Sequence, residues 1–172
     1  MNNKQADKQV KQPQYLIMLA IAAGALAIFL LVKLLTGVSN DVQNTRGETV
    51  TDADILIPLN EITENAAFYP AVVNGTDLEV IAIKAPDGTV RTAFNTCQVC
   101  YLSGKGYYTQ KGDQLVCENC GNRFSMDDVG VVHSGCNPIP ITDSNRTVSD
   151  TGITIPLETL TEATTMFKNW KR

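Results

Sequence analysis

The chain has 172 residues, with 19% charged side chains and a formal net charge of −4 at pH 7. Its length allows one domain and a membrane anchor, and its acidic balance argues against nucleic acid as a partner, because such binding needs a basic surface. The sequence contains no phosphate-binding loop, Ser/His/Asp set or metalloprotease helix, so it identifies no small-molecule substrate. We therefore expect a redox carrier or metal-binding protein more than a catalyst with its own substrate.

The first feature along the chain is a long apolar segment. Residues 15–32 carry no charge and are almost all apolar, and Lys33 and two leucines follow. A bilayer core of ~30 Å needs about 20 apolar residues in a helix. A cleaved signal peptide is the alternative, but its apolar region is usually only about 7–15 residues long. We predict an uncleaved, single-pass transmembrane signal anchor over residues 15–35.

Charges before this segment predict its orientation. Residues 1–14 contain Lys4, Lys8 and Lys11 against a single acid, Asp7. Basic residues flanking a membrane helix favour the cytoplasmic side. We therefore expect residues 1–14 to be a cytoplasmic tail and the carboxyl-terminal part of the chain to be extracytoplasmic, anchored to the cell membrane.

The remainder of the chain is acidic and begins with a polar stretch. From residue 37 onward it holds 10 of the 14 Lys and Arg residues and 17 of the 18 Asp and Glu residues. Residues 36–53 are rich in Gly, Ser, Asn, Asp and Thr without apolar periodicity, which predicts a flexible tether. The sequence then predicts one extracytoplasmic domain over residues 54–172.

Short strands and turns dominate the predicted domain. Residues 55–59 read as a strand that ends near a proline, and residues 78–83 and 89–94 flank the turn Ala85-Pro86-Asp87-Gly88. Proline and glycine at those turn positions favour an antiparallel hairpin. Residues 106–110 and 114–116 predict a second hairpin. The fold class expected is mainly β with a small α component.

A carboxyl-terminal helix is expected to close this β structure. Residues 153–162 repeat the pattern of residues 55–64, with a strand that ends at a proline followed by a helix start. A chance repeat and a true duplication both explain that similarity. The apolar positions near one helical face after the second proline are Leu157, Leu160, Ala163, Phe167 and Trp170.

All five cysteines lie within forty residues, and four of them form two Cys-x-x-Cys pairs. The two hairpins deliver the chain to Cys97–Cys100 and to Cys117–Cys120. Two such knuckles facing each other can gather four sulfurs around one metal ion. Soft sulfur ligands select zinc, iron or an iron–sulfur cluster. We predict these four cysteines as cofactor and metal ligands, with Cys136 as a fifth candidate in a Gly-Cys-Asn-Pro turn.

Other interpretations of these cysteines remain open at this stage. Two short-range disulfides plus one free thiol would suit an oxidising compartment. A structural zinc site would use the same knuckles, but four sulfurs saturate tetrahedral zinc and leave Cys136 unexplained. His133 lies three residues before Cys136 and is a metal ligand or, more simply, a surface-loop histidine.

Aromatic and basic residues alternate with the candidate ligands. The aromatic rings either shield a metal site from water or fill the core, and the basic side chains either offset thiolate charge or lie on the surface. These residues are Tyr101, Tyr107, Tyr108, Phe124, Arg91, Lys105 and Arg123.

The cysteine-rich part resembles the FtrD-like family of membrane iron–sulfur-containing proteins. The motifs that carry the resemblance are Arg91-x-Ala93-Phe94-Asn95-x-Cys97-x-x-Cys100-Tyr101, Gly104-Lys105-Gly106-Tyr107, Gly112-Asp113-x-Leu115-Val116-Cys117-x-x-Cys120-Gly121-x-Arg123-Phe124 and Gly135-Cys136-Asn137-Pro138-x-Pro140. A looser similarity extends over residues 55–167. The chain departs from the family pattern at Asn95 and Gln98, where the family usually has acids.

The resemblance implies cysteine-bound iron or another metal in a membrane-associated protein, linked in some members to iron uptake. Four thiolates suit one-electron iron chemistry, because their charge and nearby amides set the potential. We expect an iron or iron–sulfur electron carrier or metal-handling protein beside a membrane redox, reductase or metal-transport protein. The alternatives are a zinc-stabilised interaction module and a thiol–disulfide redox protein. A thiol–disulfide redox protein usually places its reactive cysteine at a helix start in a βαβ unit.

Overall fold

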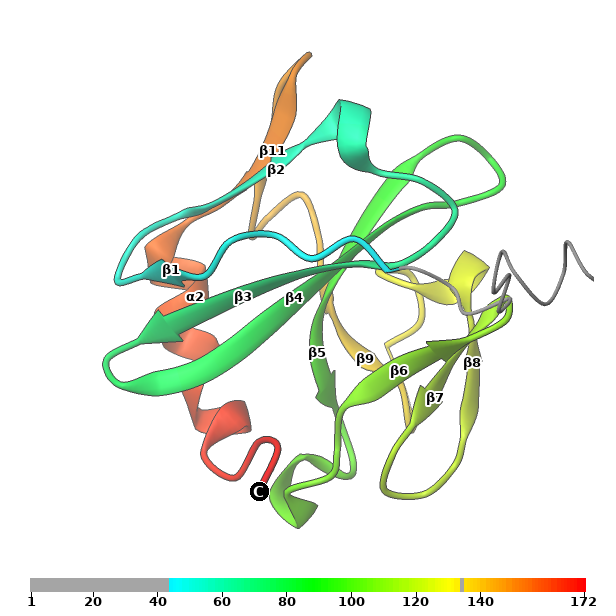
Figure 1. The fold of residues 1–172 in the computed structure, drawn as a ribbon, viewed down its shortest axis with the longest axis vertical. Helices are drawn as coiled ribbons and strands as arrows, with labels where there is room; N and C mark the ends of the chain where they lie inside the picture. Colours follow the sequence, from blue (N-terminus) through cyan, green and yellow to red (C-terminus); the bar gives the residue numbers. More distant parts are fainter. Residues whose placement is uncertain (1–43, 134) are drawn as a thin grey trace, which may run out of the picture. The chain divides into compact units, whose positions relative to one another are not determined.

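The computed structural model describes residues 44–133 and 135–172, and these form a mainly β structure with one short α-helix (Figure 1). This confirms the expected β-rich class. The strands are β1 (Val50–Thr51), β2 (Ile55–Pro58), β3 (Ala67–Val73), β4 (Thr76–Lys84), β5 (Val90–Cys97), β6 (Tyr108–Lys111), β7 (Gln114–Cys117), β8 (Arg123–Ser125), β9 (Pro138–Ile141), β10 (Thr147–Val148) and β11 (Gly152–Ile155). The helices are α2 (Leu157–Ala163) and the 3-10 turns η1 (Leu59–Glu61), η2 (Tyr101–Ser103), η3 (Met126–Asp128) and η4 (Thr164–Phe167).

The largest sheet has five strands in the order β1-β3-β4-β5-β9. Only β1 pairs in parallel; the other neighbours are antiparallel. The predicted turn joins β4 to β5, where the Gly88 N–H donates to the Ala85 carbonyl at 2.8 Å and Gly88 has φ of +82°. Both faces of β4 are buried, which explains why its sequence is nearly continuous in apolar residues instead of alternating.

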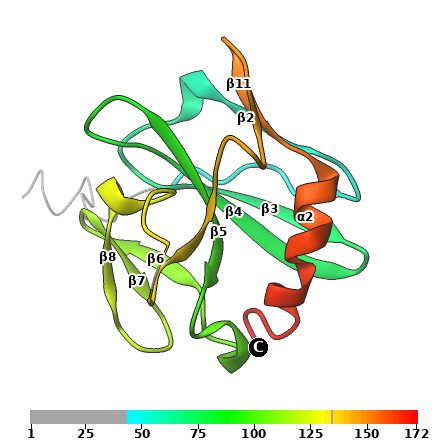
Figure 2. The same ribbon diagram turned by 180° about the vertical axis from the view of Figure 1, so that it is seen from behind.

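Apolar cores cover both faces of this sheet. On one face, residues of β3, β4 and β5 pack against β2, β11, α2 and η4, with Leu160 and Phe167 as buried anchors. On the other face, Ile81 and Ile83 pack against residues of β6, β7, β8 and η3. Figure 2 shows α2 and the β6–β8 hairpins on opposite sides of the sheet. Cys97 and Cys117 belong to the second core, so the cysteine region is built into the fold.

The two similar segments noted in the sequence pair with each other. β2 and β11 are antiparallel neighbours in a three-stranded sheet of order β10-β11-β2, with Ile57 opposite Ile153 and Ile55 opposite Ile155. Each strand then leads into a helical turn, η1 after β2 and α2 after β11. All four isoleucines are buried. The similarity therefore has a packing reason, since paired strands on one core meet the same requirements.

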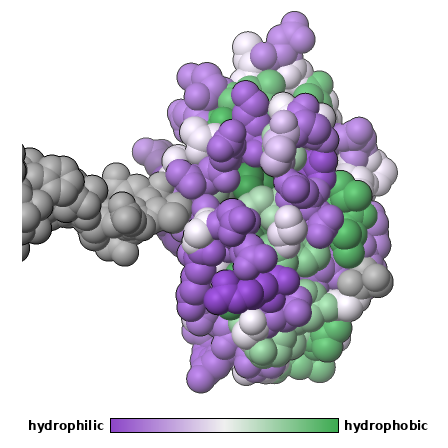
Figure 3. Space-filling view, turned by 90° about the vertical axis from the view of Figure 1, so that its right-hand side faces the viewer, coloured by the Kyte–Doolittle hydropathy of each residue, from purple (hydrophilic) through white to green (hydrophobic). Residues whose placement is uncertain are grey.

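The third sheet has the order β6-β7-β8 and contains the second predicted hairpin, with Gln110 opposite Leu115. Its outward side belongs to the face shown in Figure 3, which is largely hydrophilic with smaller apolar areas.

The folded part begins earlier than predicted. Residues 36–53 were expected to be a tether, but β1 lies in this range and pairs with β3, and Arg46 forms a bridge with Phe68. Two-residue edge pairing leaves little apolar periodicity, so the sequence pattern misses it. In the described ranges no helix is long and apolar enough for a membrane span. The predicted anchor over residues 15–35 and the tail over residues 1–14 lie outside those ranges.

Candidate metal centre

Three strand ends bring the cysteines together. Cys97 is the last residue of β5, Cys117 is the last residue of β7, and Cys136 comes shortly before β9. Since β5 and β9 are antiparallel, the end of one lies beside the start of the other, and Cys97 is registered with Pro138. The register shifts between Phe94 and Cys97, which marks an irregularity at the site.

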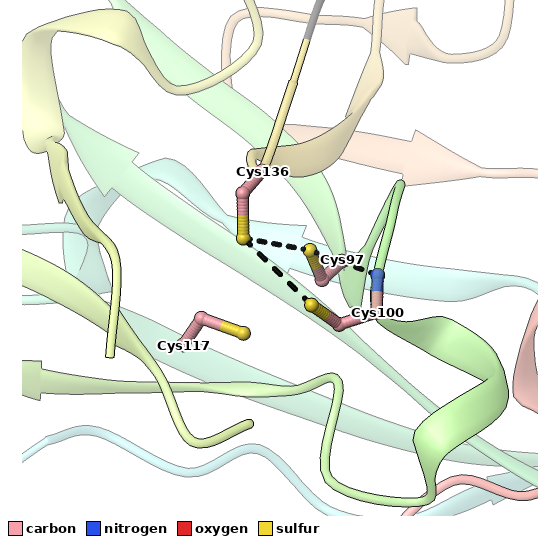
Figure 4. A group of neighbouring side chains, drawn as sticks. All are labelled: Cys97, Cys100, Cys117 and Cys136. Atoms are coloured by element: carbon pink, nitrogen blue, oxygen red, sulfur yellow. Dashed lines mark hydrogen bonds between the residues drawn. The ribbon is translucent and has the colours of Figure 1, made fainter. Parts of the chain in front are cut away.

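Four thiols form a compact group, called here the four-thiol group: Cys97, Cys100, Cys117 and Cys136. Their Sγ atoms all lie within 4.8 Å of one another. The Cys136 Sγ is 3.1 Å from that of Cys97 and 4.0 Å from that of Cys100 (Figure 4). Cys97 and Cys117 are buried, Cys100 and Cys136 are partly exposed, and all five cysteines are free thiols.

The structure groups the fifth cysteine differently from the sequence prediction. Both knuckles were expected to supply all four main ligands, but Cys136 is a member of the four-thiol group and Cys120 is not. Cys120 is exposed at the outer end of the second loop, with its Sγ 3.0 Å from that of Cys136. The β5–β9 pairing brings Cys136 inward next to Cys97, and this long-range contact leaves no signal in the cysteine spacing.

The loop backbones are shaped around the sulfurs. The Cys100 N–H donates to the Cys97 Sγ at 3.3 Å, a bond of the kind that tunes a metal thiolate. Gly121 has φ of +72°, as expected for the glycine that closes the second knuckle, and its N–H donates to the Cys117 carbonyl at 2.9 Å. A Cβ at Gly106 would lie 2.4 Å from the Cys100 carbonyl oxygen, so only glycine fits there.

Hydrogen bonds lower the pKa of some of the thiols, and burial raises the pKa of the others. Burial raises the pKa of the Cys97 thiol, but bonds from Tyr108, Cys136 and the loop amides outweigh it, so the net pKa is lowered. The Cys136 bond chiefly lowers the pKa of Cys120 to about 7. Burial raises the pKa of Cys117 to about 12, and burial is also the main cause of the raised pKa values of Cys100 and Cys136.

Tyr108 and Asn95 support the site from behind. The Tyr108 ring is buried, and its hydroxyl forms a hydrogen bond with the Cys136 Sγ at 3.8 Å. The Asn95 Oδ1 accepts from the Tyr108 N–H at 2.7 Å, and the Asn95 Nδ2 donates to the Tyr108 carbonyl at 3.3 Å. Asn95 therefore fixes the strand segment that aims the Tyr108 hydroxyl at the sulfurs.

A buried carboxylate lies beyond Asn95. Glu79 is 1% exposed, and its Oε1 accepts from the Asn95 Nδ2 at 2.8 Å. Arg46 and Lys171 lie 2.6 Å and 3.2 Å from its carboxylate oxygens. Sequence reasoning missed Glu79 and Asn95 as supporting residues. The available signal was an acid inside the apolar run 78–83.

The carboxyl-terminal residues lie against the first cysteine loop. The Arg172 N–H donates to the Gly104 carbonyl at 3.2 Å, and the Asn169 Nδ2 donates to the Leu102 carbonyl at 3.2 Å. The Trp170 Nε1 donates to the Asn95 carbonyl at 2.7 Å. Residues 169–172 therefore hold the segment that follows Cys100.

His133 and two arginines from the sequence prediction lie outside the four-thiol group. His133 is exposed and does not belong to the four-thiol group, which agrees with its interpretation as a surface-loop histidine. Arg91 pairs with Asp87 at 2.6 Å, and Arg123 donates to Gln114 at 3.3 Å. These arginines serve surface contacts and do not neutralise the thiols.

The donor set fits a tetrahedral thiolate centre. With metal–sulfur bonds of ~2.3 Å, sulfurs in such a centre lie ~3.8 Å apart. The Sγ atoms of Cys97 and Cys100 lie 3.1 Å and 4.0 Å from that of Cys136, on either side of this value. Sulfur is the only donor in the group, which fits zinc or iron and not a hard cation. The site thus defines a β-rich protein with a cysteine cluster that could hold a metal.

Comparison with known proteins agrees with this class. A family model described as "Membrane iron-sulfur containing protein FtrD-like" matches residues 48–167. The chain therefore belongs to the FtrD-like family, which is membrane-associated and named for iron–sulfur content. No curated protein and no solved structure matches it significantly.

Proposed function

We propose that this chain is a membrane-anchored, extracytoplasmic electron carrier or metal-handling protein that binds iron or an iron–sulfur cluster through its cysteines. It works beside a membrane iron-uptake or reductase system. The gathering of four Sγ atoms within 4.8 Å is the observation that carries the proposal, and membership of an iron–sulfur family favours iron over zinc. The proposed topology has a cytoplasmic tail over residues 1–14, an anchor over 15–35 and the metal-binding domain outside.

The four-thiol group supplies the proposed ligands, and Cys120 lies beside it as a fifth sulfur. When bound, iron would supply one-electron redox chemistry. The protein's own contribution is to exclude water through the buried Cys97 and Cys117 side chains and to donate hydrogen bonds to sulfur from Tyr108 and the Cys100 amide. Such bonds stabilise negative charge on a thiolate.

Thiol–disulfide oxidoreduction as the main activity has less support. The first cysteine of each pair ends a β-strand, whereas such enzymes usually place the reactive thiol at an α-helix start, where its pKa is lowered. A closed zinc site uses the same donors and is the main competing outcome.

The test is metal analysis of the full-length protein, purified in detergent without oxygen. We expect iron, with or without acid-labile sulfide, and a thiolate-to-iron absorption band that bleaches on reduction. Stoichiometric zinc without a redox-active band would overturn the iron proposal and favour the zinc-stabilised module.

Tyr108→Phe is expected to make the reduction potential of the bound iron more negative. The lost hydroxyl bond leaves more negative charge on the Cys136 sulfur, which disfavours the reduced state. A hydrogen bond of about 1 kcal/mol corresponds to about 40 mV in a one-electron couple. Redox titration of the absorption band measures the shift. Tyr107→Phe is the matched control, because the Tyr107 ring packs on Trp170, and an equal shift there would contradict the assignment.

A further inference from the structure

The five thiols exceed what one tetrahedral ion can use. Four sulfurs saturate such a centre, and the compact group already contains four. Cys120 is the remaining sulfur, and its Sγ lies 3.0 Å from that of Cys136. Cys136 therefore touches both the proposed ligands and the surplus thiol.

We propose that Cys120 and Cys136 form a disulfide under oxidation, and that this bond removes Cys136 from the ligand set and releases the metal. The release step depends on the proposed function, whereas the disulfide itself does not. Cys120 and Cys136 then form a site of reversible oxidation at the exposed edge of the cysteine cluster.

Local contacts hold the two residues together. The Asn122 Nδ2 donates to the Cys136 carbonyl at 2.9 Å and so links the second knuckle to the turn before β9. The Cys117 N–H donates to the Asn122 carbonyl at 3.0 Å and fixes the same loop. A disulfide requires its sulfurs to approach to about 2.05 Å. Exposed loop ends can make such a small approach more readily than core strands can.

Exposure distinguishes this pair from its closest competitor. The Cys97 Sγ is 3.1 Å from the Cys136 Sγ, nearly as close as that of Cys120. However, Cys97 is 0% exposed, whereas Cys120 is exposed. Because thiol–disulfide exchange begins with access of the oxidant to a thiolate, it starts at Cys120.

The oxidant is a small-molecule disulfide of the glutathione type. The Cys120 thiolate attacks one of its sulfurs, which breaks the S–S bond, forms a mixed disulfide and releases one thiolate. The Cys136 thiolate then attacks the Cys120 Sγ, forms the Cys120–Cys136 bond and expels the second thiolate. Two protein thiols lose two electrons and two protons in all, and the small disulfide becomes two thiols.

Loss of Cys136 as a ligand leaves three sulfurs in the group, those of Cys97, Cys100 and Cys117. Mutation of a residue that only hydrogen-bonds to a metal ligand typically lowers metal affinity about 10–100-fold. Loss of the ligand itself should therefore lower the affinity at least about tenfold. A reducing thiol would restore the fourth ligand and allow the metal to bind again.

The experiment treats the full-length, metal-loaded protein in detergent with oxidised glutathione under anaerobic conditions. A chromogenic chelator follows metal release, and peptide mapping after alkylation locates the disulfide. We expect a Cys120–Cys136 linkage that appears together with release. Cys120→Ser is the matched variant, expected to keep its metal and to resist oxidant-triggered release at least about tenfold better.

Two results would overturn the inference: a disulfide that joins Cys97 to Cys136 or lies within one knuckle, or release from Cys120→Ser as fast as from the parent protein. The metal-free protein is mapped in parallel. A Cys120–Cys136 bond in the metal-free protein would support the disulfide. If the reduced protein also failed to bind any metal, the proposed metal function would be refuted while the disulfide would stand. Zinc in place of iron would refute iron while still allowing the release test.

Discussion

Cys136→Ser is expected to deprive the protein of most of its bound metal, whereas Cys120→Ser is expected to leave the metal in place. Cys136 belongs to the four-thiol group and contacts the Sγ atoms of both Cys97 and Cys100. A serine hydroxyl is a poor ligand for a metal that selects soft sulfur. The affinity should fall at least about 10–100-fold.

Metal content after gel filtration, together with competition against a chelator of known affinity, measures this effect. The comparison with Cys120→Ser is the control, because that thiol is exposed and outside the group. Equal retention by both variants would contradict the assignment of Cys136 as a ligand. Loss of metal only from the Cys120 variant would reverse the ligand assignment.

Glu79→Ala is expected to destabilise the domain by about 3 kcal/mol. The carboxylate is 1% exposed and is bound by Asn95, Arg46 and Lys171. Removing the acid leaves a small void and an unpaired donor on the buried Asn95 amide. The two cations are partly exposed and can be hydrated, so the effect is at the lower end of the range for broken buried ion pairs.

Equilibrium denaturation monitored by Trp170, the single tryptophan of the chain, measures this loss within the domain. Asp143→Ala is the matched control. Asp143 pairs with Arg146 at 2.9 Å, but its side chain is 86% exposed, so its removal should change stability by less than about 1 kcal/mol. A Glu79 effect no larger than the Asp143 effect would show that the buried network does not stabilise the fold.

Local patterns predicted the hairpins and the knuckles well. The turn residues at Ala85 and Gly88 and the glycine at position 121 have the contacts or backbone conformation that their types favour. Each Cys-x-x-Cys pair was also correctly expected to follow a strand, since Cys97 and Cys117 end β5 and β7. These features depend on neighbours in sequence, and residue type alone restricts them strongly.

Long-range pairing could not be predicted in the same way. The inward position of Cys136 depends on the β5–β9 ladder, and the support of Tyr108 by Asn95 joins residues 13 positions apart. Glu79 gave only the weak signal of one acid in an apolar strand, because its partners Arg46 and Lys171 lie far away in sequence. Spacing rules contain no information on such contacts.

The position of residues 169–172 against the first cysteine loop has a consequence for biogenesis. Asn169, Trp170 and Arg172 bond to Leu102, Asn95 and Gly104, so a growing polypeptide cannot complete this loop until residues 169–172 have left the ribosome. Loading of the centre should therefore wait until residues 169–172 have been synthesised, although all five cysteines are made before them. A chaperone or donor that delivers the metal would meet a domain in which residues 169–172 already pack against the first cysteine loop.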